Sequence, residues 1–240
     1  MKAIQMAKQN HFLARIKPGD LALFAAKLEA RTFETGHVLF EVADDVDTVC
    51  FPLPDTIASL VLGLRDGSSA ESMIVGREGA IGGIVSSGHK PAFARGVIHI
   101  GGPVLLLQTT ALERAKQQSP TLRDFLARYS DCLLAQVLQS VACNALHDFD
   151  ARLARWLLMI HDRTTGDRLH VTQELIAQML GVHRSYVSGV LGRLEKGGAI
   201  RRSRGVVTVI NRRKLEKQAC ECYAYVQRHF QRLLPKVAAD

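Results

Sequence analysis

The chain has 240 residues, enough for two domains that each enclose a hydrophobic core. Apolar residues make up 47% of the chain and charged residues 22%, which is typical of a globular protein. No apolar run in the sequence approaches the roughly 20 residues of a membrane-spanning helix. The first 20 residues lack the apolar core of a signal peptide. We therefore expect a cytoplasmic protein without a membrane partner.

The cysteines also limit the class of protein. There are five of them, Cys50, Cys132, Cys143, Cys220 and Cys222, and most are far apart in the sequence. This pattern excludes a disulfide framework and fits a reducing compartment. We expect Cys220 and Cys222 to lie on a C-terminal helix, where residues two apart point to different faces. The sequence therefore predicts no metal site and no disulfide at this pair.

The chain carries a formal net charge of +8, and the whole excess of positive charge lies in its C-terminal part. Residues 1–145 contain 14 basic and 14 acidic residues, whereas residues 146–240 contain 17 basic and 9 acidic ones. Such asymmetry indicates a polyanionic partner for the C-terminal part. Ionic contacts of lysine and arginine with phosphates supply most of the non-specific affinity of proteins for nucleic acids.

Short segments of alternating apolar and polar residues fill the first half of the chain. Asp66-Gly67 between two of them is a strong signal for a hairpin turn. The expected strands are 37–42, 48–53, 57–65, 70–75, 92–100 and 103–108. Many short strands at regular spacing predict a small antiparallel barrel or jelly roll, which we assign to residues 1–118.

From Pro120 the apolar spacing changes to three and four, and it continues for more than 20 residues without glycine or proline. This spacing predicts a long amphipathic helix over residues 119–147, and a long apolar stripe usually requires a partner. A twofold dimer would pair the stripe with its copy. The residues predicted at the dimer interface are Leu122, Leu126, Tyr129, Leu133, Val137 and Val141. The alternative is that the stripe packs on the chain's own β-domain, and both contacts can coexist.

Residues 171–210 predict a helix-turn-helix motif followed by a β-hairpin. Thr172 is a candidate N-cap for the first helix, and Gly181 is suited to the left-handed backbone that ends it. A second helix is expected from Arg184 to Lys196, after which two strands flank Arg204-Gly205. A helix-turn-helix with a cationic wing is a DNA-binding design. We assign this domain to residues 148–240.

The exposed face of the second helix carries short and cationic side chains suited to base edges and phosphates. The residues predicted to contact bases are Arg184, Ser185, Ser188 and Gly189. The residues predicted to contact phosphates are Thr172, His183, Tyr186, Arg193, Arg201, Arg202 and Arg204. Double-stranded DNA is therefore the predicted partner of this domain.

Three segments resemble the CRP/FNR family of bacterial transcription regulators: VGREGAIGG at 75–83, ARLARWLL at 151–158, and LIAQMLGVHRSYVSGVLGRLEKGGAIRRSRG at 175–205. The resemblance covers nearly the whole chain. It implies an α+β fold with an N-terminal cyclic-nucleotide-binding-like β jelly roll, a long dimerisation helix and a C-terminal winged helix-turn-helix. It further implies a homodimer that binds a palindromic promoter site and acts on RNA polymerase, with the jelly roll as the sensor of a signal.

The same resemblance indicates that the residues with which family members bind a cyclic nucleotide are not all present. Cyclic-nucleotide binders of the family have Gly-Glu, which binds the ribose, and about ten residues later Arg-Ser or Arg-Thr for the phosphate. Here Gly82 is followed by Gly83, and the ungapped register places Phe93-Ala94 at the second position. Arg95 could replace the family arginine only with an insertion. Gly82, Gly83 and Arg95 are therefore the candidate effector residues.

Two further features separate the chain from known sensors of the family. The adenine-binding pair of the long helix corresponds to Val137-Leu138, whose side chains cannot form hydrogen bonds. The chain also lacks the N-terminal cysteines that hold an iron–sulfur cluster in oxygen sensors, because its first cysteine is Cys50. We expect an effector other than cyclic AMP, or none, and no cofactor.

Two other classes of protein fit the residues less well. An adaptor or ligand-binding regulatory protein whose winged domain does not contact DNA would not need Arg184, Ser185 and Ser188 on an exposed helix face. An enzyme is not expected, because the sequence contains no nucleophile elbow, phosphate-binding loop or zinc-protease motif. A DNA-binding regulator fits the residues best.

Overall fold

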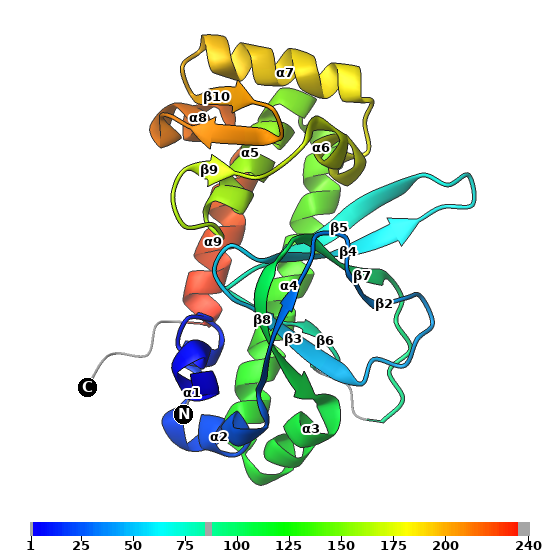
Figure 1. Ribbon diagram of the computed structural model, residues 1–240, viewed down its shortest axis with the longest axis vertical. Helices are drawn as coiled ribbons and strands as arrows, with labels where there is room; N and C mark the ends of the chain where they lie inside the picture. The colour runs from blue at the N-terminus through cyan, green and yellow to red at the C-terminus, as the bar shows by residue number, and fades with distance from the viewer. Residues whose placement is uncertain (1, 85–87, 235–240) are drawn as a thin grey trace.

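The computed structural model describes residues 2–84 and 88–234. The long helix α4 (Pro120–Leu146) runs along the molecule, with a β-roll beside its first half and a helical domain at its C-terminal end (Figure 1). This arrangement confirms the predicted α+β class, with a jelly-roll-like β-domain, a long helix and a helix-turn-helix. Within the described residues, no helix is long and apolar enough to cross a bilayer.

The β-roll consists of two four-stranded antiparallel sheets. Its strands are β1 (Glu29–Phe33), β2 (Val38–Phe40), β3 (Thr48–Pro52), β4 (Ile57–Gly63), β5 (Ser69–Val75), β6 (Ile81–Gly82), β7 (Arg95–Ile100) and β8 (Gly102–Gln108). The strand orders are β1-β8-β3-β6 and β2-β7-β4-β5. Side chains from both sheets, among them Cys50, Met73 and Ile98, meet in one buried cluster. The two sheets therefore enclose a common core, as strand alternation predicts.

Short helices cover the end of the roll beside the first turns of α4. They are α1 (Lys2–Ala7), η1 (Leu13–Arg15), α2 (Pro18–Ala22), η2 (Ala25–Lys27) and α3 (Thr109–Gln118). Ser119 caps α4 by accepting a hydrogen bond from the Leu122 amide, and Pro120 occupies its first turn. The Tyr129 hydroxyl donates to the Ala80 carbonyl and accepts from the Ala80 amide. These contacts fix α4 against the roll.

The C-terminal domain, which we call the reader domain, combines five helices with a three-stranded sheet. The helices are α5 (Phe149–His161), α6 (Gln173–Leu180), α7 (Arg184–Lys196), α8 (Arg212–Gln218) and α9 (Cys222–Leu233), and the strands are β9 (Arg168–Leu169), β10 (Ile200–Ser203) and β11 (Val206–Val209). The sheet order is β10-β11-β9. Trp156, Ile176, Val190 and Val207 belong to one buried core. This core holds α7 and the β10–β11 hairpin, which we call the wing, in fixed positions relative to each other.

The two domains share part of a core. Ile57 and Ile74 of the β-roll pack in the buried cluster of the reader domain. Glu71 on β5 accepts hydrogen bonds from Ser59 Oγ at 2.8 Å and from Trp156 Nε1 at 3.2 Å. The reader domain is therefore docked on strands β4 and β5 of the roll.

Two differences in secondary structure from the sequence-based expectation concern β1 and the C-terminal helices. Strand β1 was not expected, because its segment, EARTF, lacks apolar alternation. The structure agrees with this composition, since the residues of β1 are mostly exposed. The expected single helix through Cys220 and Cys222 is wrong: α8 ends at Gln218 and α9 begins at Cys222. Cys220 therefore lies in the connection between two helices, where the spacing rule for a helix does not apply.

Candidate nucleic-acid interface

The turn between α6 and α7 has the local geometry that its sequence predicts. Thr172 Oγ1 accepts a hydrogen bond from the Leu175 amide at 3.1 Å and so caps α6. Gly181 ends this helix with a φ of +65°, in the left-handed region that glycine enters without strain. Helix α7 begins three residues later, at Arg184. The short connection sets the direction in which α7 leaves the domain.

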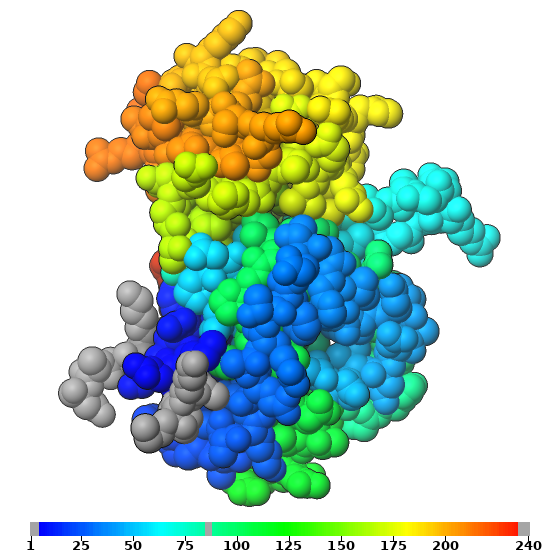
Figure 2. Space-filling model, viewed as in Figure 1, coloured from blue at the N-terminus to red at the C-terminus, as the bar shows by residue number. Residues whose placement is uncertain are grey.

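Helix α7 has one buried and one exposed face. Val187, Val190, Leu191 and Leu194 point into the core at spacings of three and four. Arg184, Ser185 and Gly189 are exposed, whereas Ser188 is half-buried. Figure 2 shows that α7 and the wing, coloured yellow to orange, together form one end of the molecule. The predicted base-contacting residues therefore lie on an accessible helix at this end.

Three of the predicted cations are paired with carboxylates of the same chain. Arg184 Nε lies 3.0 Å from Glu174, and both side chains are more than half exposed. The other two pairs are Arg193 with Asp150, joined by two hydrogen bonds of 2.7 Å, and Arg202 with Glu195 at 2.8 Å. Exposed ion pairs contribute only about 0–1 kcal/mol, so a phosphate or base edge can replace the carboxylate at Arg184.

Arg202 differs from the other two because its side chain is about two-thirds buried. It donates to Glu195 and to the Ser188 carbonyl, and its own backbone amide also donates to Glu195. Hydrogen bonds from this amide and guanidinium lower the pKa of Glu195. Arg202 thus ties β10 to α7. The structure indicates that this residue positions the wing in addition to carrying charge.

A groove separates the wing from the N-terminal ends of α6 and α7. It has a volume of about 490 Å³, and Thr172, Glu174, Arg184, Arg202 and Arg204 are among its lining residues. Arg204 is exposed at the tip of the wing, beside Gly205, whose φ of +71° forms the turn. A groove with guanidinium groups on both walls can accommodate an anionic backbone.

The remaining predicted phosphate contacts lie around the same end. Arg201 is exposed on β10, and His183 is exposed immediately before α7. Tyr186 stacks on Phe149 with 4.9 Å between ring centroids and is about half exposed. Thr172 is exposed but uses its hydroxyl oxygen as the cap of α6. All seven predicted phosphate residues thus belong to the reader domain.

The predicted dimer residues occupy two different faces of α4. Leu122, Leu126 and Tyr129 are buried inside the protomer, in the core shared with the N-terminal helices. These three residues present no surface to a partner, because they pack on the chain's own β-domain, which was the alternative to a dimer contact. Leu133 and Val137 are half-buried against the β-roll core, and Val141 is exposed.

A second apolar stripe of α4 faces away from the protomer. Leu134, Leu138 and Val141 are 57%, 61% and 64% exposed. Their spacing of four and three continues to Ala145, which is also exposed. An exposed apolar stripe on one helix marks an interaction surface. Of this stripe, the sequence-based prediction included only Val141, because α4 carries apolar residues on both faces.

The three candidate effector residues do not form one site. Arg95 on β7 pairs with Glu41 at 3.0 Å, and both side chains are about half exposed. Gly82 has a φ of +109°, and a Cβ atom there would lie 2.3 Å from the Thr48 carbonyl oxygen. At Gly83, a Cβ would lie 2.9 Å from the Val46 carbonyl oxygen. Both glycines therefore permit close packing of the chain, and Arg95 lies on the other sheet.

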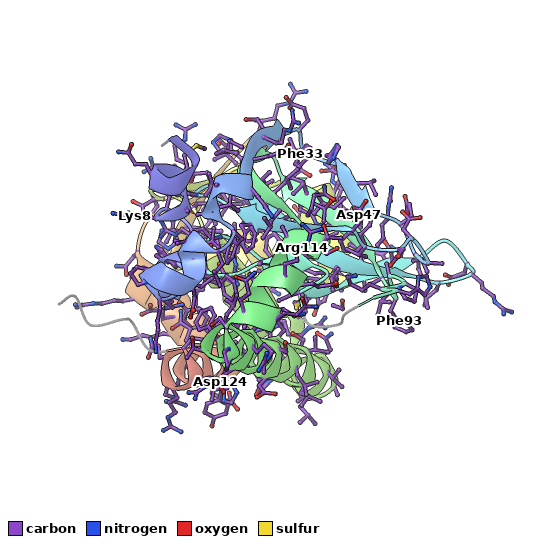
Figure 3. The ribbon with its side chains drawn as sticks, turned by 90° about the horizontal axis from the view of Figure 1, so that it is seen from below. Lys8, Phe33, Asp47, Phe93, Arg114 and Asp124 are labelled. Atoms are coloured by element: carbon purple, nitrogen blue, oxygen red, sulfur yellow. The ribbon has the colours of Figure 1, made fainter. Side chains whose placement is uncertain are left out.

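The β-roll does contain a cavity of about 420 Å³. Its lining includes Asp44, Asp45 and Asp47, and none of the three candidate residues. Figure 3 shows two of its lining residues, Phe33 and Asp47, on the β-roll when the molecule is seen from below. No lysine or arginine is among the described residues that line it. An acidic lining disfavours a phosphate group.

The described residues thus combine a docked β-roll, a long helix with an exposed apolar stripe and a winged helix-turn-helix with a cationic end surface. Residues 151–218 match the family of Crp-like helix-turn-helix domains. The C-terminal domain of the chain therefore contains a Crp-like helix-turn-helix. No curated protein matches the sequence.

Solved structures of CRP/FNR regulators have the same fold. FixK2 from Bradyrhizobium japonicum is 16% identical, with a TM-score of 0.70 over 80% of this chain and 98% of that one. A CRP-family transcriptional regulator from Thermus thermophilus is 21% identical, with a TM-score of 0.65 over 79% and 96%. The c-di-GMP-responsive global regulator CLP from Xanthomonas campestris is 16% identical, with a TM-score of 0.62 over 80% and 99%.

Proposed function

We propose that the protein is a homodimeric, sequence-specific regulator that binds a palindromic promoter site in double-stranded DNA and acts on RNA polymerase. The observation that carries this proposal is the accessible α7, with the guanidinium-lined groove between it and the wing. In this arrangement α7 enters the major groove, and the wing lies along the phosphate backbone.

Base and backbone contacts divide between the two elements. Arg184 begins α7, so its guanidinium can exchange Glu174 for the O6 and N7 acceptors of a guanine. Ser185, Ser188 and Gly189 follow on the same helix, and Gly189 has no side chain between the helix backbone and the bases. The exposed Arg201 and Arg204 of the wing supply phosphate contacts.

The homodimer forms through the exposed stripe of α4. Leu134, Leu138, Val141 and Ala145 follow the spacing of the a and d positions of a coiled coil. A stripe of this kind is self-complementary about a twofold axis, since each residue can meet its own copy or a neighbour on the same stripe. The axis would also place two copies of α7 on one face, as a palindromic site requires.

The sensor ligand, where one acts, is not cyclic AMP in this proposal. Val137 and Leu138, at the positions of the family's adenine-binding pair, offer no hydrogen bonds, and the roll cavity is lined by aspartates. Burying a phosphate against carboxylates without a cation would be costly. We therefore expect cyclic AMP and cyclic GMP to leave the melting temperature unchanged. A ligand that did bind, at 100 times its Kd, would stabilise the folded protein by about 2.7 kcal/mol and raise the melting temperature measurably.

Selection of bound sequences from a random DNA pool, followed by titration at several salt concentrations, tests the DNA contacts. The wild type should select a palindrome with half-sites about one helical turn apart. We expect Arg184→Ala to relax preference at one symmetric position in each half-site, losing about 1–3 kcal/mol of discrimination. Arg204→Ala should keep the selected motif, weaken all binding equally and reduce the salt slope by about one unit per protomer.

Two results would contradict the proposal. An unchanged motif for Arg184→Ala would remove α7 from the major groove. A wild-type protein without salt-dependent DNA binding would favour the alternative function, an adaptor or ligand-binding protein whose winged domain does not bind DNA.

A further inference from the structure

Four metal-ligating side chains from two separate stretches of the sequence meet where the reader domain joins α4. Cys143 lies in the last turn of α4, and His147 is the residue that follows the helix. Cys220 lies in the connection between α8 and α9, and Cys222 is the first residue of α9. The sequence predicted no metal site here, because the pair Cys143 and His147 is far from the pair Cys220 and Cys222, with 77 positions between Cys143 and Cys220.

The ligand atoms of these four residues all lie within 4.8 Å of one another. Cys143 Sγ is 3.5 Å from Cys220 Sγ, and Cys222 Sγ is 3.5 Å from His147 Nδ1. Two sulfurs bound tetrahedrally to one zinc ion at about 2.3 Å are separated by about 3.8 Å. The observed spacing therefore needs only small side-chain adjustments to surround one ion.

Ordinary apolar packing does not explain the arrangement. The buried cluster here consists of the three cysteines, with only Ala151 packed against them among the hydrophobic residues described. A disulfide between Cys143 and Cys220 would satisfy two thiols but would leave Cys222 and His147 facing each other. A tetrahedral ion uses all four groups.

Polar groups around the cluster contact the ligand side chains in the way that supporting residues of a metal site do. His147 Nε2 lies 3.3 Å from Glu221 Oε2, a contact that places the ring proton on Nε2 and leaves the Nδ1 lone pair toward Cys222. A carboxylate on the distal nitrogen is the usual support of a metal-bound histidine. Gln139 Nε2 donates a hydrogen bond to Cys222 Sγ at 3.0 Å.

Two arginines supply compensating charge. Arg155 interacts electrostatically with Cys143, and Arg152 with both Cys143 and Cys220. The Nε atoms of both arginines are buried and have no hydrogen-bond partner among the described residues. Three thiolates, a neutral imidazole and a divalent ion carry a net charge of −1. The guanidinium groups can offset that charge.

We propose that Cys143, His147, Cys220 and Cys222 bind one zinc ion in a structural Cys3His site. Each of the three thiols gives up its proton when the ion binds, and His147 binds as the neutral imidazole. Soft sulfur ligands in a closed tetrahedral set favour zinc over magnesium or calcium. The ion joins the start of α9 to the end of α4, and its binding energy adds to the stability of that junction.

The full-length protein, purified under reducing conditions, tests this site by elemental analysis. We expect one zinc per chain, and after exchange into cobalt we expect the absorption bands of a tetrahedral cobalt–thiolate centre. Cys143→Ala, His147→Ala, Cys220→Ala and Cys222→Ala should each lose the metal. Cys50→Ala and Cys132→Ala are the matched controls, because these buried cysteines lie in other cores, and both should retain it.

Two conservative variants keep the test decisive if an alanine variant fails to fold. His147→Cys should retain zinc in a four-cysteine site. Glu221→Gln should keep the stoichiometry but weaken zinc affinity about 10- to 100-fold, as changes in outer-shell partners do. Folded wild-type protein without zinc, zinc retained by all four alanine variants, or a Cys143–Cys220 disulfide under these conditions would each overturn the proposal.

Discussion

Gly189 is the residue of α7 at which stability and DNA binding are expected to oppose each other. A Cβ atom there would approach only Arg193 Nη1, at 3.8 Å, an ordinary contact. The folded domain therefore does not need glycine at this position, and a glycine inside a helix costs about 1 kcal/mol relative to alanine. Its absence of a side chain is useful only where the helix backbone approaches another surface closely.

We therefore predict that Gly189→Ala stabilises the protein by about 0.5–1 kcal/mol and weakens operator binding. Chemical denaturation and DNA titration measure the two effects on the same sample. Gly192→Ala is a suitable control, because a Cβ there meets only the tip of Arg202 at 3.8 Å and lies under the wing. Equal operator affinity for wild type and Gly189→Ala would show that the helix backbone is not close to the bases.

At the scale of elements, α4 shows what periodicity can and cannot predict. The spacing of its apolar residues predicted a long helix, and the structure confirms one of 27 residues. The same spacing could not assign its faces, because apolar residues at 122, 126, 129 and 133 face the protomer and those at 134, 138 and 141 face outward. Each stripe has helical period, so only packing against the β-roll distinguishes them.

The outward stripe gives a prediction for the dimer. Leu138→Glu should produce a folded monomer with weak operator affinity, because the charge is solvated in the protomer but would be buried without a partner in the dimer. Sedimentation and the melting temperature check the two parts. Phe93→Glu, at an exposed apolar residue outside α4, should remain dimeric (Figure 3).

Leu133→Glu should behave differently from Leu138→Glu. Leu133 packs against the cores of the roll and of the N-terminal helices, so a carboxylate there should destabilise the protomer itself. A Leu138→Glu protein that remained a dimer in sedimentation would exclude the outward stripe from the interface.

Among the other sequence-based predictions, those that depend on a few neighbouring residues agree with the structure, and those that depend on contacts between distant residues do not. The N-cap Thr172, the left-handed Gly181 and the basic wing turn are each encoded within a few residues, and all were predicted with their correct elements. The cysteine cluster was not, because Cys143 and Cys220 are 77 positions apart and meet only after the domains fold. The candidate effector residues also failed to converge, since pairing places Gly82 and Arg95 on different sheets.

At the scale of the whole molecule, Glu71 is a titratable contact between the β-roll and the reader domain. Burial raises its pKa to about 7, although hydrogen bonds from Ser59 and Trp156 favour the ionised form. The folded protein thus binds this proton more tightly than the unfolded chain, in which the pKa is near 4.5. Its contribution to stability is complete below pH 4.5, falls as the pH rises and is lost above pH 7.

We predict that the wild type loses stability between pH 4.5 and 7 through this group, by up to about 3 kcal/mol. Glu71→Gln should remove that part of the pH dependence and be more stable than wild type at about pH 8. The glutamine oxygen can still accept from Trp156, and its amide can donate to Ser59. Denaturation curves of both proteins across this range provide the check, and parallel pH profiles would show that Glu71 is not the responsible group.

Helix α9 gives the reader domain a second anchor on the rest of the protomer. It runs beside α4 from the reader domain toward the N-terminal helices (Figure 1), where Phe230 and Leu234 pack in the core of that end. The first anchor is the short connection between α4 and α5. With attachments at both places, the reader domain cannot rotate about the α4–α5 connection alone. Since the proposed zinc site holds the start of α9 to the end of α4, a signal that redirects α7 must act through the C-terminal end of α9 and change the packing of Phe230 and Leu234 there.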